Sequence, residues 1–238
     1  KIESKGYIDM TLKTLKTFGI TVTETENGWS IPGGQKYHGP RMRYAEGDWS
    51  NAAFWLVAGA IGGSIGCQGL DMESPQGDRA IAALLEEFGA ETKVALNQIT
   101  ATHKEMKGIR IDASQIPDLV PILCVAAAAA EGKTEIYNAG RLRMKESDRL
   151  AVMAECMQKI GVEVEERPDS IIITGGCNPP EGEIVIDSHN DHRIVMAMAI
   201  AAVSLGVELT ILGAEAVNKS YPSFFIELAK LGGVTNVL

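Results

Sequence analysis

One stretch of the chain, DRAIAALLEEFGAETKV at residues 78–94, has the apolar spacing of an amphipathic helix of about eleven residues. Gly89 follows an apolar residue where this pattern ends, which is typical of a glycine that caps a helix in the left-handed conformation. Similar segments carry the equivalent Gly19, Gly161 and Gly232, so that the four glycines follow one another at intervals of 70, 72 and 71 residues. A unit of about 70 residues is therefore repeated along the chain.

A second kind of helix alternates with the first. It is predicted to start near Asp48, Asp118 and Asp191, and its residues are apolar almost all round, as expected of a buried helix. Short strand patterns flank it, as in IRIDA before the second of these helices and TEIYN after it. The repeating unit is thus β-α-β-α-β-β, and we expect an α+β fold with buried helices and external sheets. A solenoid is less favoured, because the two helix types differ so much in predicted burial.

The repeats predict how the chain divides into domains. Three units lie between about residue 43 and Leu238, the last of them incomplete, whereas residues 1–42 hold only the second half of a unit. We expect residues 1–42 to be the terminal part of a domain whose remainder lies outside this chain. Residues 43–238 should form a nearly complete second domain. Since the chain opens in the middle of a pattern, we expect it to be a fragment of a longer protein.

Composition excludes several classes of function. The net charge of −9 argues against nucleic acid or an anionic membrane surface as a partner held by bulk electrostatics. The longest apolar runs, of about ten residues, fall short of the roughly 20 needed to span a bilayer. The four cysteines are dispersed without paired spacing, so we expect neither a disulfide framework nor a zinc site, and a cytoplasmic location.

Basic residues occur where helix dipoles disfavour them. The segment RLRMKESDRL, residues 141–150, places Lys145 and Arg149 around a predicted helix start capped by Ser147 or Asp148. Similar positions are predicted for His192 and Arg193 in HNDHRIV, and for Lys219 in NKSYPSFF, before a cap at Ser220. Bound anions at converging helix starts would neutralise both side chains and dipoles. The alternative is that these basic side chains are solvated and that each changes the stability of the fold by only a few tenths of a kcal/mol. We favour this alternative for any single helix start, but not for three that recur in register within the repeat.

Two carboxylates complete this prediction. Glu146 would lie among Lys145, Arg149 and Arg193, whose charges lower its pKa, while burial would raise it. A carboxyl group between these two influences could exchange a proton, as general acid–base catalysis requires. Asp118 starts a different buried helix, and taken alone it is more simply interpreted as an N-cap.

Five ordered motifs resemble the C-terminal half of the EPSP synthase (3-phosphoshikimate 1-carboxyvinyltransferase) family, and together they cover essentially the whole chain. They are SKGYIDMTL, EGDWSNAAFWL, RMKESDRL, NDHRIVMA and NKSYPSFFIELAKLGG. The resemblance implies a fold of two domains, each built from three β-α-β-α-β-β units, which agrees with the repeat. It also implies transfer of the carboxyvinyl group of phosphoenolpyruvate to the 5-hydroxyl of shikimate 3-phosphate, by addition and then elimination of phosphate, in the shikimate pathway to aromatic amino acids.

The resemblance also implies the roles of individual residues. Asp118 in IPDLV matches the base for the 5-hydroxyl, and Glu146 in KESDR matches the group that exchanges a proton with the methylene carbon of phosphoenolpyruvate. Arg149, Arg193 and Lys219 match the phosphoenolpyruvate clamp, and Lys219 also matches a proposed proton-transfer group. Because both substrates are anionic and the chemistry needs only an acid and a base, we expect no cofactor and no metal.

Further residues match contacts to the acceptor substrate. Lys145 and Ser4 match ligands of shikimate 3-phosphate, Tyr7 is expected near it, and His192 lies beside the clamp. At one position the chain departs from the family, whose members often carry Asn four residues before the motif lysine. Arg141 stands there, and we leave it out of the predicted site.

Part of the family's site has no counterpart in these 238 residues. The N-terminal lysine–serine pair, the glycine-rich loop with its nearby arginine and the Ser-Ser-Gln cluster, which form the opposing wall of the cleft, are missing. We therefore expect the missing N-terminal half of the enzyme to be a required partner, and this chain to be inactive alone.

Two alternatives remain open. The first is the related carboxyvinyltransferase that acts on UDP-N-acetylglucosamine, whose hallmark is a reactive cysteine in a basic loop. None of the four cysteines lies in such a loop, and KESDR favours the shikimate enzyme. The second is a non-catalytic half that only binds phosphate, as a module of a split protein.

Overall fold

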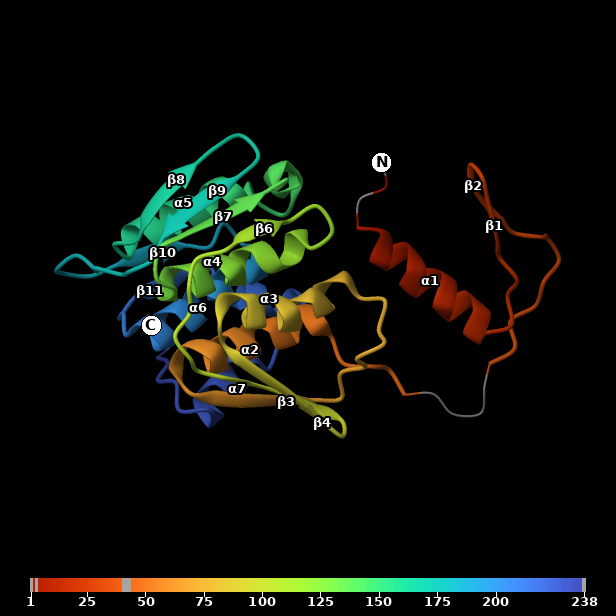
Figure 1. Ribbon diagram of the computed structural model, residues 1–238, viewed down its shortest axis with the longest axis horizontal. Helices are drawn as coiled ribbons and strands as arrows, with labels where there is room; N and C mark the ends of the chain where they lie inside the picture. Colours follow the sequence, from red (N-terminus) through yellow and green to blue (C-terminus); the bar gives the residue numbers. More distant parts are fainter. Residues whose placement is uncertain (1, 3, 40–43, 237–238) are drawn as a thin grey trace.

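The computed structural model describes residues 2, 4–39 and 44–236, and Figure 1 shows their arrangement. The predicted boundary between residues 42 and 43 lies outside the described residues. No helix in the described part of the chain is long and apolar enough to cross a membrane.

The predicted β-α-β-α-β-β unit is present in full in the middle of the chain. Its elements are β6 (Arg110–Asp112), α4 (Val120–Ala129), β7 (Lys133–Tyr137), α5 (Arg149–Lys159), β8 (Glu163–Glu166) and β9 (Ile171–Thr174). Two 3-10 turns, η2 (Pro117–Leu119) and η3 (Gly140–Met144), lead into its helices. η2 carries Asp118, and η3 ends directly before Lys145 and Glu146.

The units on either side are less complete. The first runs through α2 (Trp49–Gly62), β3 (Ser64–Gln68), η1 (Gly77–Ala80), α3 (Ile81–Phe88), β4 (Glu91–Ala95) and β5 (Gln98–Thr102), and residues 44–48 form no strand before it. The last runs through β10 (Val185–Asp187), α6 (His192–Leu205), β11 (Thr210–Leu212), η4 (Ala214–Lys219) and α7 (Phe224–Lys230). The leading half-unit holds α1 (Lys5–Thr17), β1 (Thr23–Thr25) and β2 (Gly28–Ser30).

The second kind of helix forms the core, as predicted. α2, α4 and α6 pack against one another, and residues 120–128 of α4 are all buried. Each buried Leu, Ile or Phe side chain stabilises the fold by about 1.5–3 kcal/mol relative to an exposed one. The small side chains of Ala126, Ala127 and Ala128 allow the helices to approach closely. The starts of these helices are consequently held at fixed positions relative to one another.

Sheets cover the outside of this core. The strand orders are β3-β5-β4, β6-β7-β9-β8 and β10-β11, and within these three sheets the β6–β7 and β10–β11 pairs are parallel. Alternate residues of β5 and β9 are buried, because one face of each sheet contacts the helices. The predicted α+β class with external sheets is therefore confirmed.

The leading segment lies to one side of this body (Figure 1). α1 contains no buried residue, and it contacts the rest of the molecule through Tyr7 in its first turn and through Lys13, whose Nζ atom lies 3.4 Å from Asp71 Oδ2. A Cβ on Gly6 would lie 2.5 Å from the carbonyl oxygen of Pro75, so the two backbones are nearly in contact there. The start of α1 is thereby placed beside the predicted site.

Candidate active site

The predicted site forms where three helix starts converge. Asp118 lies in η2 before α4, Arg149 is the first residue of α5, and Arg193 is the second residue of α6. α4 packs against both other helices, which brings these starts together.

Arg149 is at the centre of this site, with only 1% of its surface exposed. Its guanidinium donates to Asp191 Oδ2 at 2.7 Å, to Asp118 Oδ1 at 2.8 Å and to Glu146 Oε2 at 2.5 Å. A buried charge requires such partners, because its desolvation is costly. The cation at the start of α5 is thus paired with carboxylates of the chain itself.

Asp118 is the common partner of the basic groups. Its carboxylate lies 3.1 Å from Lys145 Nζ, 2.8 Å from Arg149 Nη1 and 3.5 Å from Arg193 Nη2. Burial raises the pKa of this carboxyl, but the charges of Arg193, Lys145 and Arg149 outweigh burial and lower the pKa to about 2. No side chain caps α4, so the simpler interpretation of Asp118 as an N-cap is wrong.

Asp191 has two functions, of which the sequence indicated one. It caps α6, whose start was predicted near this residue, by accepting a hydrogen bond from the backbone N–H of Arg193. Its fully buried carboxylate also pairs with Arg149 and accepts from the Ser147 hydroxyl at 3.0 Å. Burial raises the pKa of Asp191, but the hydrogen bond and charge of Arg149, together with the bonds from the Arg193 N–H and the Ser147 hydroxyl, outweigh burial and lower the pKa. The sequence does not indicate that an aspartate at an N-cap position also binds a distant side chain. The hydrogen bond from Arg149 to Asp191 joins residues 42 positions apart.

Glu146 differs from the other two carboxylates in its accessibility. Its side chain is 42% exposed, and its carboxylate pairs with the Nη2 group of Arg149. Asp148 rather than Ser147 caps α5, by accepting from the N–H of Ala151. Glu146 is therefore free of capping and faces the open side of the cluster.

The prediction for Lys219 is wrong in its structural reason. α7 begins only at Phe224, after Ser223, and Lys219 is instead the last residue of η4. Ser220 ends that 3-10 turn and caps no helix start. A cation at the end of a helical turn is favoured rather than disfavoured by the dipole. Lys219 Nζ nevertheless points toward the cluster, where it donates to the carbonyl oxygen of Asn190 at 2.5 Å.

His192 lies beside the clamp residues, as expected. It is 7% exposed, and its Nδ1 atom is buried without a hydrogen-bond partner among the described residues. Burial lowers the pKa of His192, and the positive charge of Arg193 lowers it further. Both effects favour the neutral form of His192.

The start of α1 contributes two more of the predicted residues. The Tyr7 hydroxyl donates to Asp118 Oδ2 at 3.1 Å, and the Ser4 hydroxyl accepts from Arg141 Nη1 at 3.1 Å. Burial and the nearby charges of Asp78 and Asp118 raise the pKa of Tyr7. Arg141, which sequence analysis left out, thus contacts a residue that it included.

The predicted residues therefore gather in one place. Lys145, Arg149 and Arg193 share the carboxylate of Asp118, and Lys219 binds the residue next to Asp191. In the part of the chain that is described, no group of three or more His, Cys, Asp or Glu side chains could hold a metal ion.

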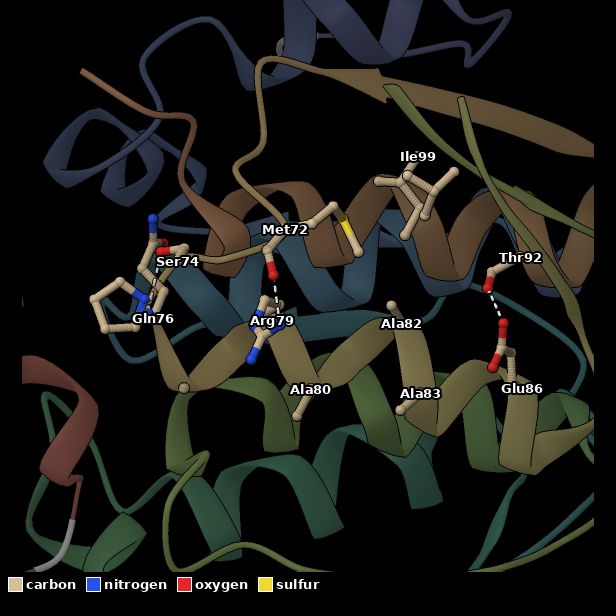
Figure 2. A pocket seen from close by; sticks show the side chains of 13 residues that line it. Met72, Ser74, Gln76, Arg79, Ala80, Ala82, Ala83, Glu86, Thr92 and Ile99 are labelled. Carbon is tan, nitrogen blue, oxygen red and sulfur yellow. Dashed lines mark hydrogen bonds between the residues drawn. The ribbon is translucent and has the colours of Figure 1, made fainter. Parts of the chain in front are cut away.

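A groove elsewhere on the molecule has a different character. It encloses about 520 Å³ along α3, and Figure 2 shows its lining. Arg79 donates to the carbonyl of Met72 there, and Thr92 donates to Glu86. None of the predicted site residues lines this groove, and its charged groups do not converge, so we do not place the active site in it.

Comparison with known proteins tests the resemblance directly. Residues 1–228 match the family EPSP synthase (3-phosphoshikimate 1-carboxyvinyltransferase). The chain belongs to the EPSP synthase family. Relatives named 3-phosphoshikimate 1-carboxyvinyltransferase include that of Clostridium acetobutylicum, 47% identical over 98% of this chain and 53% of its own length. Another is that of Halobacterium salinarum, 40% identical over 99% of this chain and 56% of its own length.

Solved structures agree with this membership. The EPSP synthase of Acinetobacter baumannii superimposes with a TM-score of 0.77 at 32% identity, over 94% of this chain and 54% of that one. The enolpyruvyl transferase NikO of Streptomyces tendae, at 18% identity and a TM-score of 0.76, is similar in fold. The chain spans about half the length of the EPSP synthase relatives that it matches.

Proposed function

We propose that the protein to which this chain belongs transfers the carboxyvinyl group of phosphoenolpyruvate to the 5-hydroxyl of shikimate 3-phosphate, in the shikimate pathway. The observation that carries this proposal is the convergence of Lys145, Arg149 and Arg193 on Asp118, with Glu146 exposed beside them, in a member of the EPSP synthase family.

Substrate binding and base strength are coupled at Asp118. Side chains of Lys145 and Arg193 are 25% and 11% exposed, so both can reach phosphate or carboxylate groups of the substrates. An anion that draws these cations away from Asp118 raises the pKa of its carboxyl from about 2 toward its ordinary value. Asp118 thereby becomes a stronger base when both substrates are in place.

The proton transfers follow from these positions. Asp118 accepts the proton of the 5-hydroxyl group of shikimate 3-phosphate as the oxygen of that hydroxyl bonds to C2 of phosphoenolpyruvate. Glu146 or Lys219 delivers a proton to C3. In the elimination, a proton leaves the new methyl group as the bond from C2 to the phosphate oxygen breaks and phosphate departs. Glu146, which is accessible and free of capping, is suited to both transfers at this carbon.

Arg149 has a separate role in this scheme. Three carboxylates surround its buried guanidinium, so it holds Asp118, Glu146 and Asp191 in their relative positions. This contribution adds to its expected place in the phosphoenolpyruvate clamp. Lys145, Ser4 and Tyr7 would bind shikimate 3-phosphate, and His192 would support the clamp.

The opposing wall of the cleft must come from the other half of the enzyme. We propose that the full-length protein is active and that the isolated chain is not. Phosphate release from phosphoenolpyruvate plus shikimate 3-phosphate should be detected with the full-length protein only. Release by the isolated chain above the level of its Glu146→Ala variant would show that this half is sufficient.

The same assay with UDP-N-acetylglucosamine as acceptor tests the first alternative. Burial raises the pKa of all four thiols, to about 11 for Cys67 and about 12 for Cys156. None is an activated nucleophile, so we expect no turnover with this acceptor. The four cysteines are free, which supports a cytoplasmic location.

The second alternative, a half that binds phosphate without catalysis, makes a different prediction. Glu146→Gln in the full-length protein should abolish turnover and leave the affinity for shikimate 3-phosphate nearly unchanged. Binding without any detectable turnover by the unaltered protein would favour the non-catalytic alternative.

A further inference from the structure

A carboxylate that sequence analysis did not select lies next to the candidate active site. Asp78, in η1, is only 4% exposed, and its carboxylate accepts a hydrogen bond from the hydroxyl of Ser50 at the start of α2. Ser50 is fixed in turn, because its backbone N–H donates to the N-cap residue Asp48 at 2.8 Å. The Asp78 carboxylate therefore has one defined orientation.

The surrounding backbone places Asp78 at a junction of three segments. A Cβ on Gly77 would lie 2.8 Å from the carbonyl oxygen of Gln115, and one on Gly6 would lie 3.1 Å from the backbone nitrogen of Gly77. The backbone nitrogen of Lys5 donates to the Gln115 side chain at 3.0 Å. These contacts pack the segments that carry Tyr7, Asp78 and Asp118 directly against one another.

The charge of Asp78 is not explained by local stability. Among the described residues, no basic nitrogen lies within ion-pair distance of its carboxylate. The charged and titratable groups that act on it are Arg193, Asp118, Asp48 and Tyr7. Burial raises the pKa of Asp78 to about 6. An amide would keep the bond from Ser50 without this desolvation, so the negative charge itself requires another explanation.

We propose that Asp78 is a positioning residue, whose carboxylate, held by Ser50 at this junction, attracts Arg193 and keeps Arg193 and the Tyr7 hydroxyl in place beside Asp118. The inference rests on the proposed function, because Asp118 and Arg193 are the base and the clamp of that reaction.

The test compares three variants of the full-length protein with the unaltered protein. Asp78→Asn removes the charge and keeps the acceptor. Ser50→Ala releases the carboxylate. Asp71→Asn is the matched control, since its side chain is 42% exposed on the loop that leads to Asp78. For Asp78→Asn we expect kcat to fall at least about tenfold, as a small misplacement of catalytic groups does, with each KM changed less than about threefold.

Ser50→Ala should lower kcat less, and adding it to Asp78→Asn should cause no further loss, because the two act through one contact. Asp71→Asn should leave kcat unchanged. Urea unfolding distinguishes positioning from a structural role. Above pH 7 the midpoint for Asp78→Asn should equal or exceed that of the unaltered protein, and the difference should shrink toward pH 4, where Asp78 is protonated in the folded state.

Full kcat in Asp78→Asn would overturn the inference, and so would a fall in kcat accompanied by a lower unfolding midpoint above pH 7. If the unaltered full-length protein releases no phosphate from the two substrates, the proposed function itself fails, which is a distinguishable result.

Discussion

At the scale of single residues, the site is organised by ion pairs inside the chain. Arg149 is buried, and each of its three guanidinium nitrogens donates to a carboxylate. Asp118 and Asp191 are distant from it in sequence, and Glu146 lies three residues before it. Removing one member of a buried ion pair leaves the other uncompensated, which is far more costly than losing an exposed pair. Arg149 should therefore be a determinant of stability as well as of catalysis.

Arg149→Ala tests this directly. The substitution leaves Asp191 buried and unpaired, and we expect the free energy of unfolding to fall by about 3–5 kcal/mol in urea titrations. Arg167→Ala is the control, since Arg167 also pairs with two carboxylates but its side chain is 46% exposed. Equal effects of the two substitutions would contradict the central position of Arg149.

Asp118 should make stability depend on pH. Its pKa of about 2 in the folded state lies below the ordinary value of 3.8, so its ionised form stabilises the fold above pH 4, and this contribution is lost as the pH falls toward 2. The difference corresponds to about 2 kcal/mol. Unfolding measured from pH 7 to pH 2 should show Asp118→Asn as less stable at high pH, with the two curves approaching each other below about pH 4 and converging near pH 2. A difference that is independent of pH would exclude this linkage.

Asp118→Asn should also abolish most of the turnover of the full-length protein. Loss of a general base lowers kcat by about 10²–10⁴-fold. The phosphate-release assay measures this change, with Asp112→Asn, an exposed aspartate on β6, as the control. Retention of more than about a tenth of kcat would assign the base to another residue.

At the scale of elements, the glycines of the repeat end their helices as predicted. Gly19, Gly89, Gly161 and Gly232 all have positive φ angles, between 80° and 112°. Their surroundings differ, however. A Cβ at Gly161 would lie 1.8 Å from the carbonyl oxygen of Asn178, whereas one at Gly232 would meet no atom within 4 Å. The same repeat position is thus under different steric constraints.

Alanine substitutions at these two glycines distinguish the strain of a left-handed backbone from the steric overlap of an added Cβ with a neighbouring segment. Gly232→Ala should lower the free energy of unfolding by about 1–2 kcal/mol, the cost of a left-handed conformation for a residue with a Cβ. Gly161→Ala should have a larger effect, because the backbone near Asn178 must also move. Thermal unfolding of the two variants checks this order, and a smaller shift for Gly161→Ala would contradict the close approach.

At the scale of the whole molecule, the core and the leading segment differ in how far their residues are buried. α2, α4 and α6 bury one another, whereas α1 contains no buried residue and contacts the body at the turn that carries Ser4 and Tyr7 and through the exposed ion pair of Lys13 with Asp71. Residues 44–238 should therefore fold without the segment before them. Hydrogen exchange should be slow in α4 and fast in α1 of the present chain, and loss of protection in α4 on deleting residues 1–43 would contradict an independent core.

The sequence by itself determined the repeat, the α+β class, the identity of the buried helices and the family, because periodic apolar spacing and ordered motifs are local properties of the chain. It also indicated most of the residues that gather at the site. Only the tertiary structure showed that Asp118 is an ion-pair partner and not a cap, that Lys219 ends a 3-10 turn, that Asp191 pairs with Arg149, and that Asp78 is buried against Ser50. These properties depend on which helix starts meet in space, and contacts between residues 28 to 42 positions apart leave no periodic trace in the sequence.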